Sequence, residues 1–79
     1  MDSKTQYQKI FIESLSIERE KFNENIKYND IPEWDSIGHM TLMSNLEEEF
    51  DINIETDDIV DFSSFKKGIE ILKKYKVTI

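Results

Sequence analysis

The sequence predicts an all-α fold: a four-helix bundle with three longer helices and one short third helix. Apolar residues recur at intervals of three and four along separate segments of the chain. The only alternating stretch, residues 51–55, is too short to outweigh those helical patterns. The length of 79 residues suits one domain spanning residues 1–79.

The first helix is predicted to end near residues 15–16. Asp2 or Ser3 can cap its start. Ile17 falls off the apolar stripe and Ser16 competes for backbone hydrogen bonds, so residues 16–20 could start a single further turn. The stripe has helical spacing and comprises Tyr7, Ile10, Phe11, Ser14 and Leu15.

Residues 23–34 are predicted to form a long loop. Its Asn and Asp residues favour turns, and Pro32 disfavours a helical conformation at Ile31. We expect this loop to be pinned to the core because it carries Ile26, Tyr28, Ile31 and Trp34.

The second helix is predicted from Ser36 to Phe50, with Asp35 and Ser36 both suited to cap it. Its core face is Leu42, Met43, Leu46 and Phe50. Ile37 and Met40 lie on another face. They either fill extra core or form an exposed apolar patch rimmed by acidic residues.

Two further helices complete the bundle. Thr56 is predicted to cap a short helix over residues 57–61, with Asp57 and Asp58 in its first turn. Ser63 or Ser64 is predicted to cap the last helix, whose lysines suit its C-terminal end. The buried face of the last helix is expected to be Phe65, Ile69 and Leu72.

Charge is distributed unevenly along the chain. The net charge is −7, yet the segment between Lys27 and Lys66 contains eleven acidic residues and no Lys or Arg. Such a field repels nucleic acid and attracts basic protein surfaces, although a merely solubilising face would look the same. No apolar run approaches the roughly 20 residues that span a bilayer. The N-terminus does not read as a secretory signal. We expect a cytoplasmic monomer.

The residue inventory offers little for catalysis or metal binding. There is one histidine and no cysteine, which argues against a zinc site. His39 lies one helical turn after Ser36, but nothing indicates an oxyanion hole, and His39 is interpreted as an ordinary helix-surface or boundary residue. A calcium loop starting at Asp51 fails at its sixth and twelfth positions, Thr56 and Phe62.

Ser36 is the residue best placed for a covalent modification. A serine that opens a helix after a long loop presents its hydroxyl to solvent, and the helix N-terminus stabilises a phosphate placed on it. Most serines at such positions are simple caps, so the motif Asp35-Ser36-Ile37 is weak when taken alone.

The segments WDSIGHMTL (residues 34–42) and LEEEF (residues 46–50) together resemble the acyl carrier protein family. In that family an Asp-Ser-Leu motif opens the second helix and a Leu-Glu-x-x-Phe segment closes it. The resemblance continues through the short third helix to Leu72 and covers nearly the whole chain.

This resemblance implies a carrier rather than an enzyme. Ser36 would hold a covalent 4′-phosphopantetheine arm, attached from coenzyme A by a phosphopantetheinyl transferase, and acyl cargo would be held on the arm as a thioester. Asp35 would support the modification. Acyl-loading and acyl-transfer enzymes would grip one helix face through basic residues. That face comprises Ile37, Met40, Glu47 and Glu48.

The sequence departs from the pattern of fatty acid biosynthesis carriers. Gly38 and Thr41 stand where those proteins usually have acidic residues, Ile37 replaces Leu, and Trp34 replaces a small residue. The string is closer to stand-alone carriers of specialised pathways, such as surface-glycan or secondary-metabolite (polyketide) clusters. Two alternatives stay open: an aminoacyl or peptidyl carrier, and a helical interaction module without a prosthetic group.

Overall fold

The computed structural model describes residues 3–79. Three longer helices and one short helix follow each other in the predicted order, with a single 3-10 turn after the first. No strand occurs within residues 3–79. The all-α prediction with a short third helix is therefore confirmed. The elements are α1 (Ser3–Leu15), η1 (Arg19–Lys21), α2 (Ser36–Phe50), α3 (Thr56–Asp61) and α4 (Phe65–Lys74).

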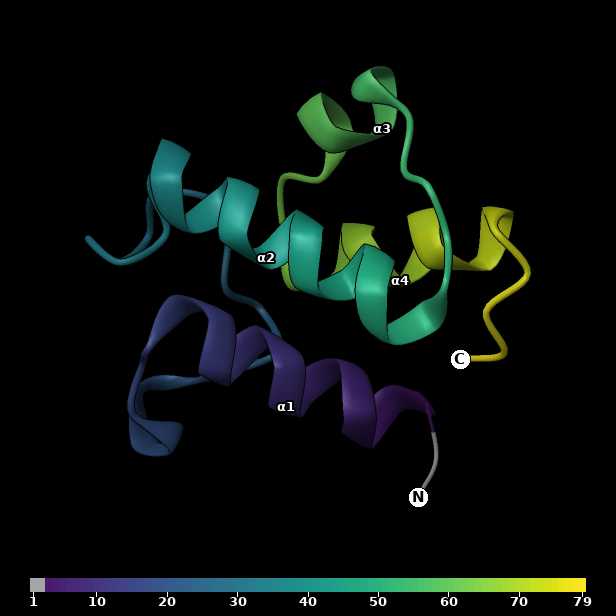
Figure 1. Cartoon of the computed structure of the whole chain (residues 1–79). Coiled ribbons are helices and arrows are strands. Elements are labelled where there is room, and N and C mark those ends of the chain that lie inside the picture. The colour runs from purple at the N-terminus through teal and green to yellow at the C-terminus, as the bar shows by residue number, and fades with distance from the viewer. Residues whose placement is uncertain (1–2) are drawn as a thin grey trace.

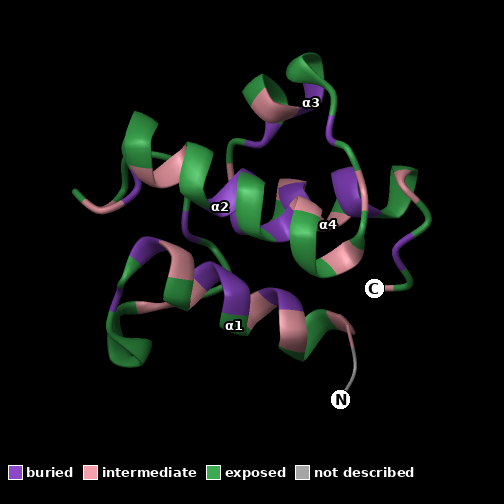
Figure 2. Ribbon diagram, viewed as in Figure 1, coloured by how far each residue is buried: buried purple, intermediate pink, exposed green. Residues whose placement is uncertain are grey.

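The helices form a bundle in which α3 stands apart. Figure 1 shows α1 running along α2, with α4 behind α2 and α3 on the opposite side of α2 from α1. The purple buried segments in Figure 2 face one another between α1, α2 and α4, whereas α3 is largely exposed. Of the residues in α3, only Asp58 is buried. The apolar core thus belongs mainly to the three longer helices and the loop between α1 and α2.

Aromatic side chains dominate that core. Phe11 of α1 lies within 4.9 Å of the Trp34 ring centroid and 5.3 Å of the Phe65 centroid, both edge-to-face. Tyr7 stacks on Phe65 at 4.5 Å and donates its hydroxyl to the Phe65 carbonyl oxygen. Burial raises the pKa of the Tyr7 phenol well above its usual value. These rings join α1, the loop and α4 into one packed unit.

The three longer helices end in the same way. Ser16, Asp51 and Lys76 follow α1, α2 and α4 in a left-handed conformation, with φ of 54°, 54° and 67°. The next amide donates back to a carbonyl five residues earlier, as in Ile17 to Ile12 and Val77 to Leu72. This turn explains why Ile17 is buried although it falls off the helical stripe.

The loop between α1 and α2 is pinned as predicted, by apolar contacts and by backbone pairing. Ile26 and Trp34 are buried. The Tyr28 amide donates to the Ser63 carbonyl, and the Phe65 amide donates to the Ile26 carbonyl. These bonds fasten the loop to the connection between α3 and α4. Tyr28 itself is 36% exposed.

Several local predictions need correction. The turn after α1 does not start at Ser16, because the left-handed Ser16 breaks the helix, and η1 begins at Arg19. Thr56 is the first residue of α3 and not its cap; Glu55 takes that position, and its side chain makes no capping bond. In α4, Ile71 is buried whereas Ile69 is only half-buried.

The predictions for the caps of α4 and α1 each named two candidate residues. Ser64, and not Ser63, caps α4 by accepting from the Lys67 amide. Ser3 lies inside α1, and the alternative cap Asp2 lies outside the described residues.

Candidate functional site

The start of α2 assigns different tasks to Asp35 and Ser36. Asp35 is the N-cap, and its Oδ1 accepts a hydrogen bond from the Gly38 amide at 2.9 Å. Ser36 is the first helical residue, and its side chain is exposed. Its Oγ lies 3.3 Å from the hydroxyl of Tyr28. The Ser36 hydroxyl is therefore solvent-accessible and is not the helix cap.

Gly38 and Trp34, two of the residues that depart from the pattern of fatty acid biosynthesis carriers, have clear packing roles. A Cβ on Gly38 would overlap the Glu33 carbonyl oxygen, so the loop can approach the first turn of α2 this closely only because residue 38 is glycine. Trp34 is fully buried and packs edge-to-face on Phe11. Both residues hold the end of the long loop against the helix that begins with Ser36.

His39 has a structural role that the sequence interpretation missed. The Trp34 Nε1–H donates to His39 Nδ1 at 2.9 Å, and His39 Nε2 lies 2.8 Å from the carbonyl oxygen of Ile59 in α3. Indole can only donate and a carbonyl can only accept. The geometry therefore fits the neutral imidazole with its proton on Nε2. His39 is half-buried and bridges the start of α2 to α3.

A positional signal for this pair was present in the sequence. With Asp35 as N-cap, Trp34 occupies the position before the cap and His39 the fourth helical position. Apolar residues at these two positions commonly pack as a hydrophobic staple. Here the same spacing places an indole donor against an imidazole acceptor.

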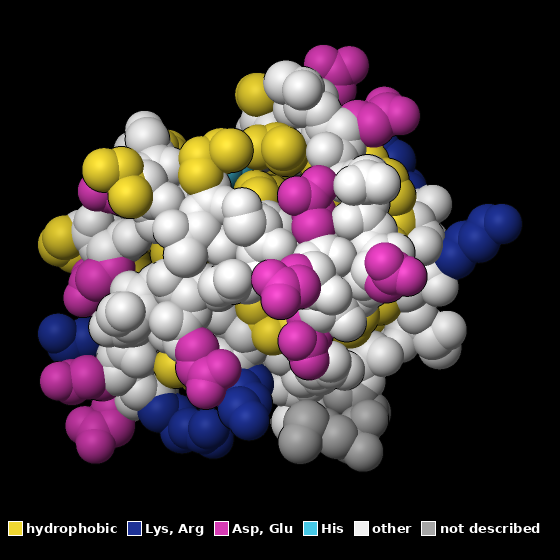
Figure 3. All heavy atoms as spheres, viewed as in Figure 1, with side chains coloured by type: hydrophobic (Ala, Val, Ile, Leu, Met, Phe, Trp, Pro, Cys, Tyr) yellow, Lys and Arg dark blue, Asp and Glu magenta, His cyan; other side chains and the backbone are white. Residues whose placement is uncertain are grey.

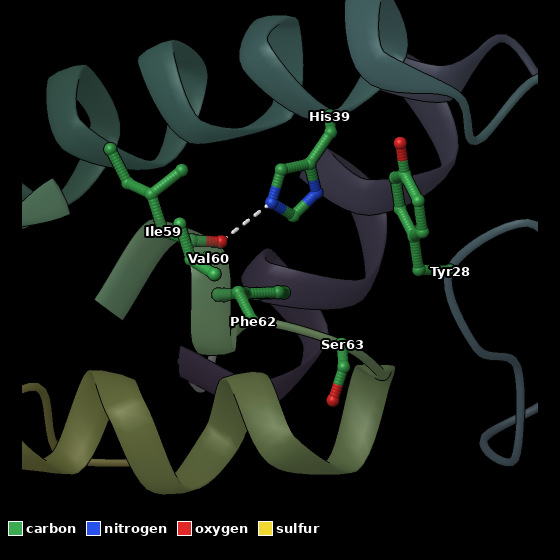
Figure 4. Close-up of a pocket in the computed structure, with 6 residues that line it drawn as sticks. All are labelled: Tyr28, His39, Ile59, Val60, Phe62 and Ser63. Carbon is green, nitrogen blue, oxygen red and sulfur yellow. Dashed lines mark hydrogen bonds between the residues drawn. The ribbon is translucent and has the colours of Figure 1, made fainter. Parts of the chain in front are cut away.

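An apolar hollow of about 260 Å³ opens beside this bridge. Figure 4 shows His39 projecting from α2 towards α3, where the dashed line marks its bond to Ile59, with the Tyr28 ring on its other side. The Tyr28 and His39 ring centroids are 5.4 Å apart. Tyr28 thus borders the hollow and also contacts Ser36. The lining residues are Tyr28, His39, Ile59, Val60, Phe62 and Ser63.

The four predicted docking residues differ in solvent exposure and in their bonds. Ile37 is 78% exposed and Met40 is 53% exposed, so they form an exposed patch and do not fill the core. Glu48 is exposed, whereas Glu47 is half-buried and its Oε2 accepts from the Ile54 amide at 2.8 Å. Glu47 therefore helps to hold the connection between α2 and α3.

Val60 of α3 is a further exposed apolar residue that the sequence interpretation missed. It is 78% exposed. Figure 3 shows hydrophobic side chains gathered over the start of α2 and over α3, with acidic side chains along the rest of α2. A surface groove of about 570 Å³ follows α2 next to this patch. Its lining residues are Ser36, Ile37, Met40, Thr41, Ser44 and Asn45.

The far side of α3 is fixed by a charged cluster. Asp58 accepts from Lys74 Nζ through Oδ1 and from the Tyr75 hydroxyl through Oδ2, both at 2.5 Å. The Tyr75 oxygen also accepts from the Glu55 amide at 2.9 Å. The bonds from Lys74 and Tyr75 lower the pKa of Asp58, and the bond to Asp58 raises the pKa of both partners.

Within residues 3–79, no group of three or more His, Cys, Asp and Glu side chains is arranged to hold a metal ion. In the same residues, no helix combines the length and the apolarity needed to cross a membrane.

Comparison with known proteins identifies relatives over most of the chain. No family model matches the sequence. The acyl carrier proteins of two strains of Buchnera aphidicola subsp. Acyrthosiphon pisum (Tuc7 and APS) are each 33% identical over 66 residues, covering 84% of this chain and 82% of theirs. The acyl carrier protein of Zymomonas mobilis subsp. mobilis is 28% identical over 75 residues, covering 95% of this chain and 96% of its own. With this similarity and its all-helical fold, the chain belongs to the acyl carrier protein family and has the role of a carrier.

Proposed function

We propose that the chain carries acyl groups as thioesters on a 4′-phosphopantetheine arm joined to Ser36. The observation that carries this proposal is the exposed Ser36 hydroxyl at the first residue of α2, left free of capping because Asp35 performs that task. The N-terminal amides and dipole of a 15-residue helix favour a phosphate at this position. The exposed Ser36 hydroxyl and the N-terminus of α2 therefore fit a phosphopantetheine group.

A phosphopantetheinyl transferase would attach the arm. The Ser36 Oγ–phosphorus bond forms while the phosphoanhydride bond of coenzyme A breaks, and the hydroxyl proton passes to a base of the transferase as the adenosine bisphosphate leaves. Asp35 would support this step by fixing the first turn of α2 and by lying close to the metal ion of the transferase. Once attached, the arm supplies a terminal thiol that holds acyl cargo as a thioester.

The surface around Ser36 favours brief contact with basic partners. Ile37, Met40 and Val60 offer exposed apolar anchors, and Glu48 lies exposed further along α2. Acyl-loading and acyl-transfer enzymes with basic docking surfaces would bind here rapidly and in a salt-dependent way. Glu47 would contribute less to binding than Glu48, because one of its oxygens is engaged by the Ile54 amide.

The decisive experiment is intact-mass analysis after incubation with coenzyme A, Mg²⁺ and a broad-specificity transferase. The wild-type chain should gain one phosphopantetheine group, and Ser36→Ala should gain none. Ser44→Ala is the matched control, because Ser44 is another exposed serine of α2, and it should be modified like wild type. Absence of the adduct from folded wild type, or its persistence in Ser36→Ala, would refute the proposal.

The cargo and the docking face have separate readouts. Mass analysis of thioester-bound cargo from the native host should find acyl groups; an amino acid would instead indicate an aminoacyl carrier.

Glu48→Lys should slow cargo transfer from an acyl-loading enzyme severalfold at low salt. Glu70→Lys, the same charge change on an exposed residue of α4, should have little effect. Equal effects of the two changes would argue against the proposed face.

A further inference from the structure

The hollow beside Ser36 has one wall that is weakly held. Residues of α3 supply Ile59 and Val60 to its lining, yet Ile59 is only half-buried and Val60 is 78% exposed. Apolar burial therefore contributes little to keeping this wall in place. Neither end of α3 has a side-chain cap or a left-handed stop of the kind that closes the longer helices.

Polar bonds join α3 to both α4 and α2, and they include an exposed ion pair from Asp61 to Lys67 of α4 at 3.8 Å. Asp58 binds Lys74 and Tyr75 at the C-terminal end of α4. The Ile59 carbonyl, one residue later, binds His39 of α2 at the hollow. Loss of the Asp58 attachment would leave the exposed Asp61–Lys67 ion pair between α3 and α4. Loss of the His39 attachment would free only the wall of the hollow.

We propose that His39 is a positioning residue that keeps α3 closed over the hollow, and that Trp34 sets the tautomer His39 needs for this task. In the neutral imidazole, a proton on Nε2 for donation to the Ile59 carbonyl leaves Nδ1 as the unprotonated nitrogen. Trp34 enforces that state by donating to Nδ1. The entrance to the hollow is thereby controlled from the helix start that carries Ser36, whatever Ser36 carries.

The bond is well suited to act as a releasable pin. It joins a half-buried side chain to a backbone carbonyl, and its net contribution is that of one hydrogen bond. Breaking it leaves Asp58 bound to α4, which provides a fixed point for the movement. His39 contacts the ring of Phe62, which follows α3 and packs on Tyr7 of the aromatic core. The proposed opening is therefore confined to Ile59 and Val60 and leaves the buried Phe62 ring in place.

A pair of substitutions separates the two bonds of His39. In His39→Gln the amide nitrogen reaches the position of Nε2 and can still donate to Ile59, but the acceptor for Trp34 is lost. In His39→Asn the amide oxygen reaches the position of Nδ1 and can still accept from Trp34, but the bond to Ile59 is lost. Each variant loses the imidazole ring and one bond, so their global stabilities should be similar.

Amide hydrogen exchange on the full chain is the readout. His39→Asn should speed hydrogen exchange of the Val60, Asp61 and Phe62 amides about three- to tenfold. The α1 amides should exchange no faster than the change in global stability requires. His39→Gln should leave those α3 amides closer to wild type. Equal acceleration in both variants, acceleration spread over all helices, or no change in His39→Asn would overturn the proposal.

Trp34→Phe provides the second variant, since it keeps an aromatic ring but removes the donor that selects the tautomer. If the His39 variants fail to fold, this change alone should accelerate exchange at the end of α3 about two- to threefold beyond the change in α1. A uniform change across α1 and α3 would show that Trp34 contributes only to packing, and it would refute the assigned role.

Discussion

The three longer helices and α3 are held by different forces. The Phe11 and Phe65 side chains are fully buried in an aromatic core shared by α1, the long loop and α4. In α3 the one buried residue is an aspartate, and Ile59 is only half-buried against the core. Polar bonds from Asp58, the Ile59 carbonyl and Asp61 join this helix to its neighbours. Apolar burial gives a rigid body, whereas a few specific bonds give a part that can detach locally.

The largest expected effect tests the rigid body. Phe11→Ala should lower the free energy of unfolding by about 3–5 kcal/mol, because it removes a ring from a fully packed core. Such a loss approaches the total stability of a domain of this size, so urea denaturation followed by circular dichroism should show marked or complete unfolding. Val60→Ala, a control in α3 at 78% exposure, should change stability by about 0.5 kcal/mol or less. Comparable losses of unfolding free energy in Phe11→Ala and Val60→Ala would contradict the difference between the aromatic core and α3.

A smaller, local effect is expected from Asp58. Its folded-state pKa is lowered from the ordinary 3.8 by Lys74 and Tyr75, so its contribution is complete above 3.8 and is lost as pH falls through the lowered pKa. The raised pKa values of Lys74 and Tyr75 place the opposite loss above pH 10. Nuclear magnetic resonance shifts of α3 amides should therefore change as the pH falls below 3.8, where Asp58 takes up its proton.

Asp58→Asn should abolish that low-pH response and loosen α3 at neutral pH. Asp57→Asn is the control, since Asp57 is an exposed neighbour in the same first turn of α3. If Asp57→Asn removed the acid response as well, the attachment to α4 would not be its cause.

The smallest effect concerns the ends of the longer helices. Ser16→Gly should raise the free energy of unfolding by about 0.5–1 kcal/mol, because glycine adopts the left-handed conformation at φ 54° without steric cost. Ser44→Gly, the same change inside α2, should lower stability by a similar amount. Thermal melts of the two variants should shift in opposite directions, and a shift in the same direction would contradict the role of the left-handed turn.

The elements that sequence periodicity predicted well are those with apolar faces. The bounds of α2 and the end of α1 agree with the prediction, since both follow from an apolar stripe and a capping or breaking residue. The exposure of Ile37 and Met40 could not be decided from spacing, because a second apolar face suits a core and a docking surface equally.

The parts that could not be predicted depend on contacts between distant segments. His39 meets Ile59 twenty residues away, and Asp58 meets Lys74 sixteen residues away. The helical spacing of apolar residues predicts neither of these contacts. The cap of α3 was mispredicted for a related reason: the chain is positioned there by the buried Ile54 and by the Glu55 carbonyl, which accepts from the Asp58 and Ile59 amides, so Thr56 has no capping task.

The division of tasks between Asp35 and Ser36 has a consequence for the life cycle of the protein. Since the cap bond belongs to Asp35, a group added to or removed from Ser36 Oγ alters no hydrogen bond that holds the start of α2. Its described side-chain contact is the 3.3 Å approach to Tyr28 at the surface. The proposed modification of Ser36 would therefore leave the bonds at the start of α2 intact, and folding of the chain would not have to wait for it.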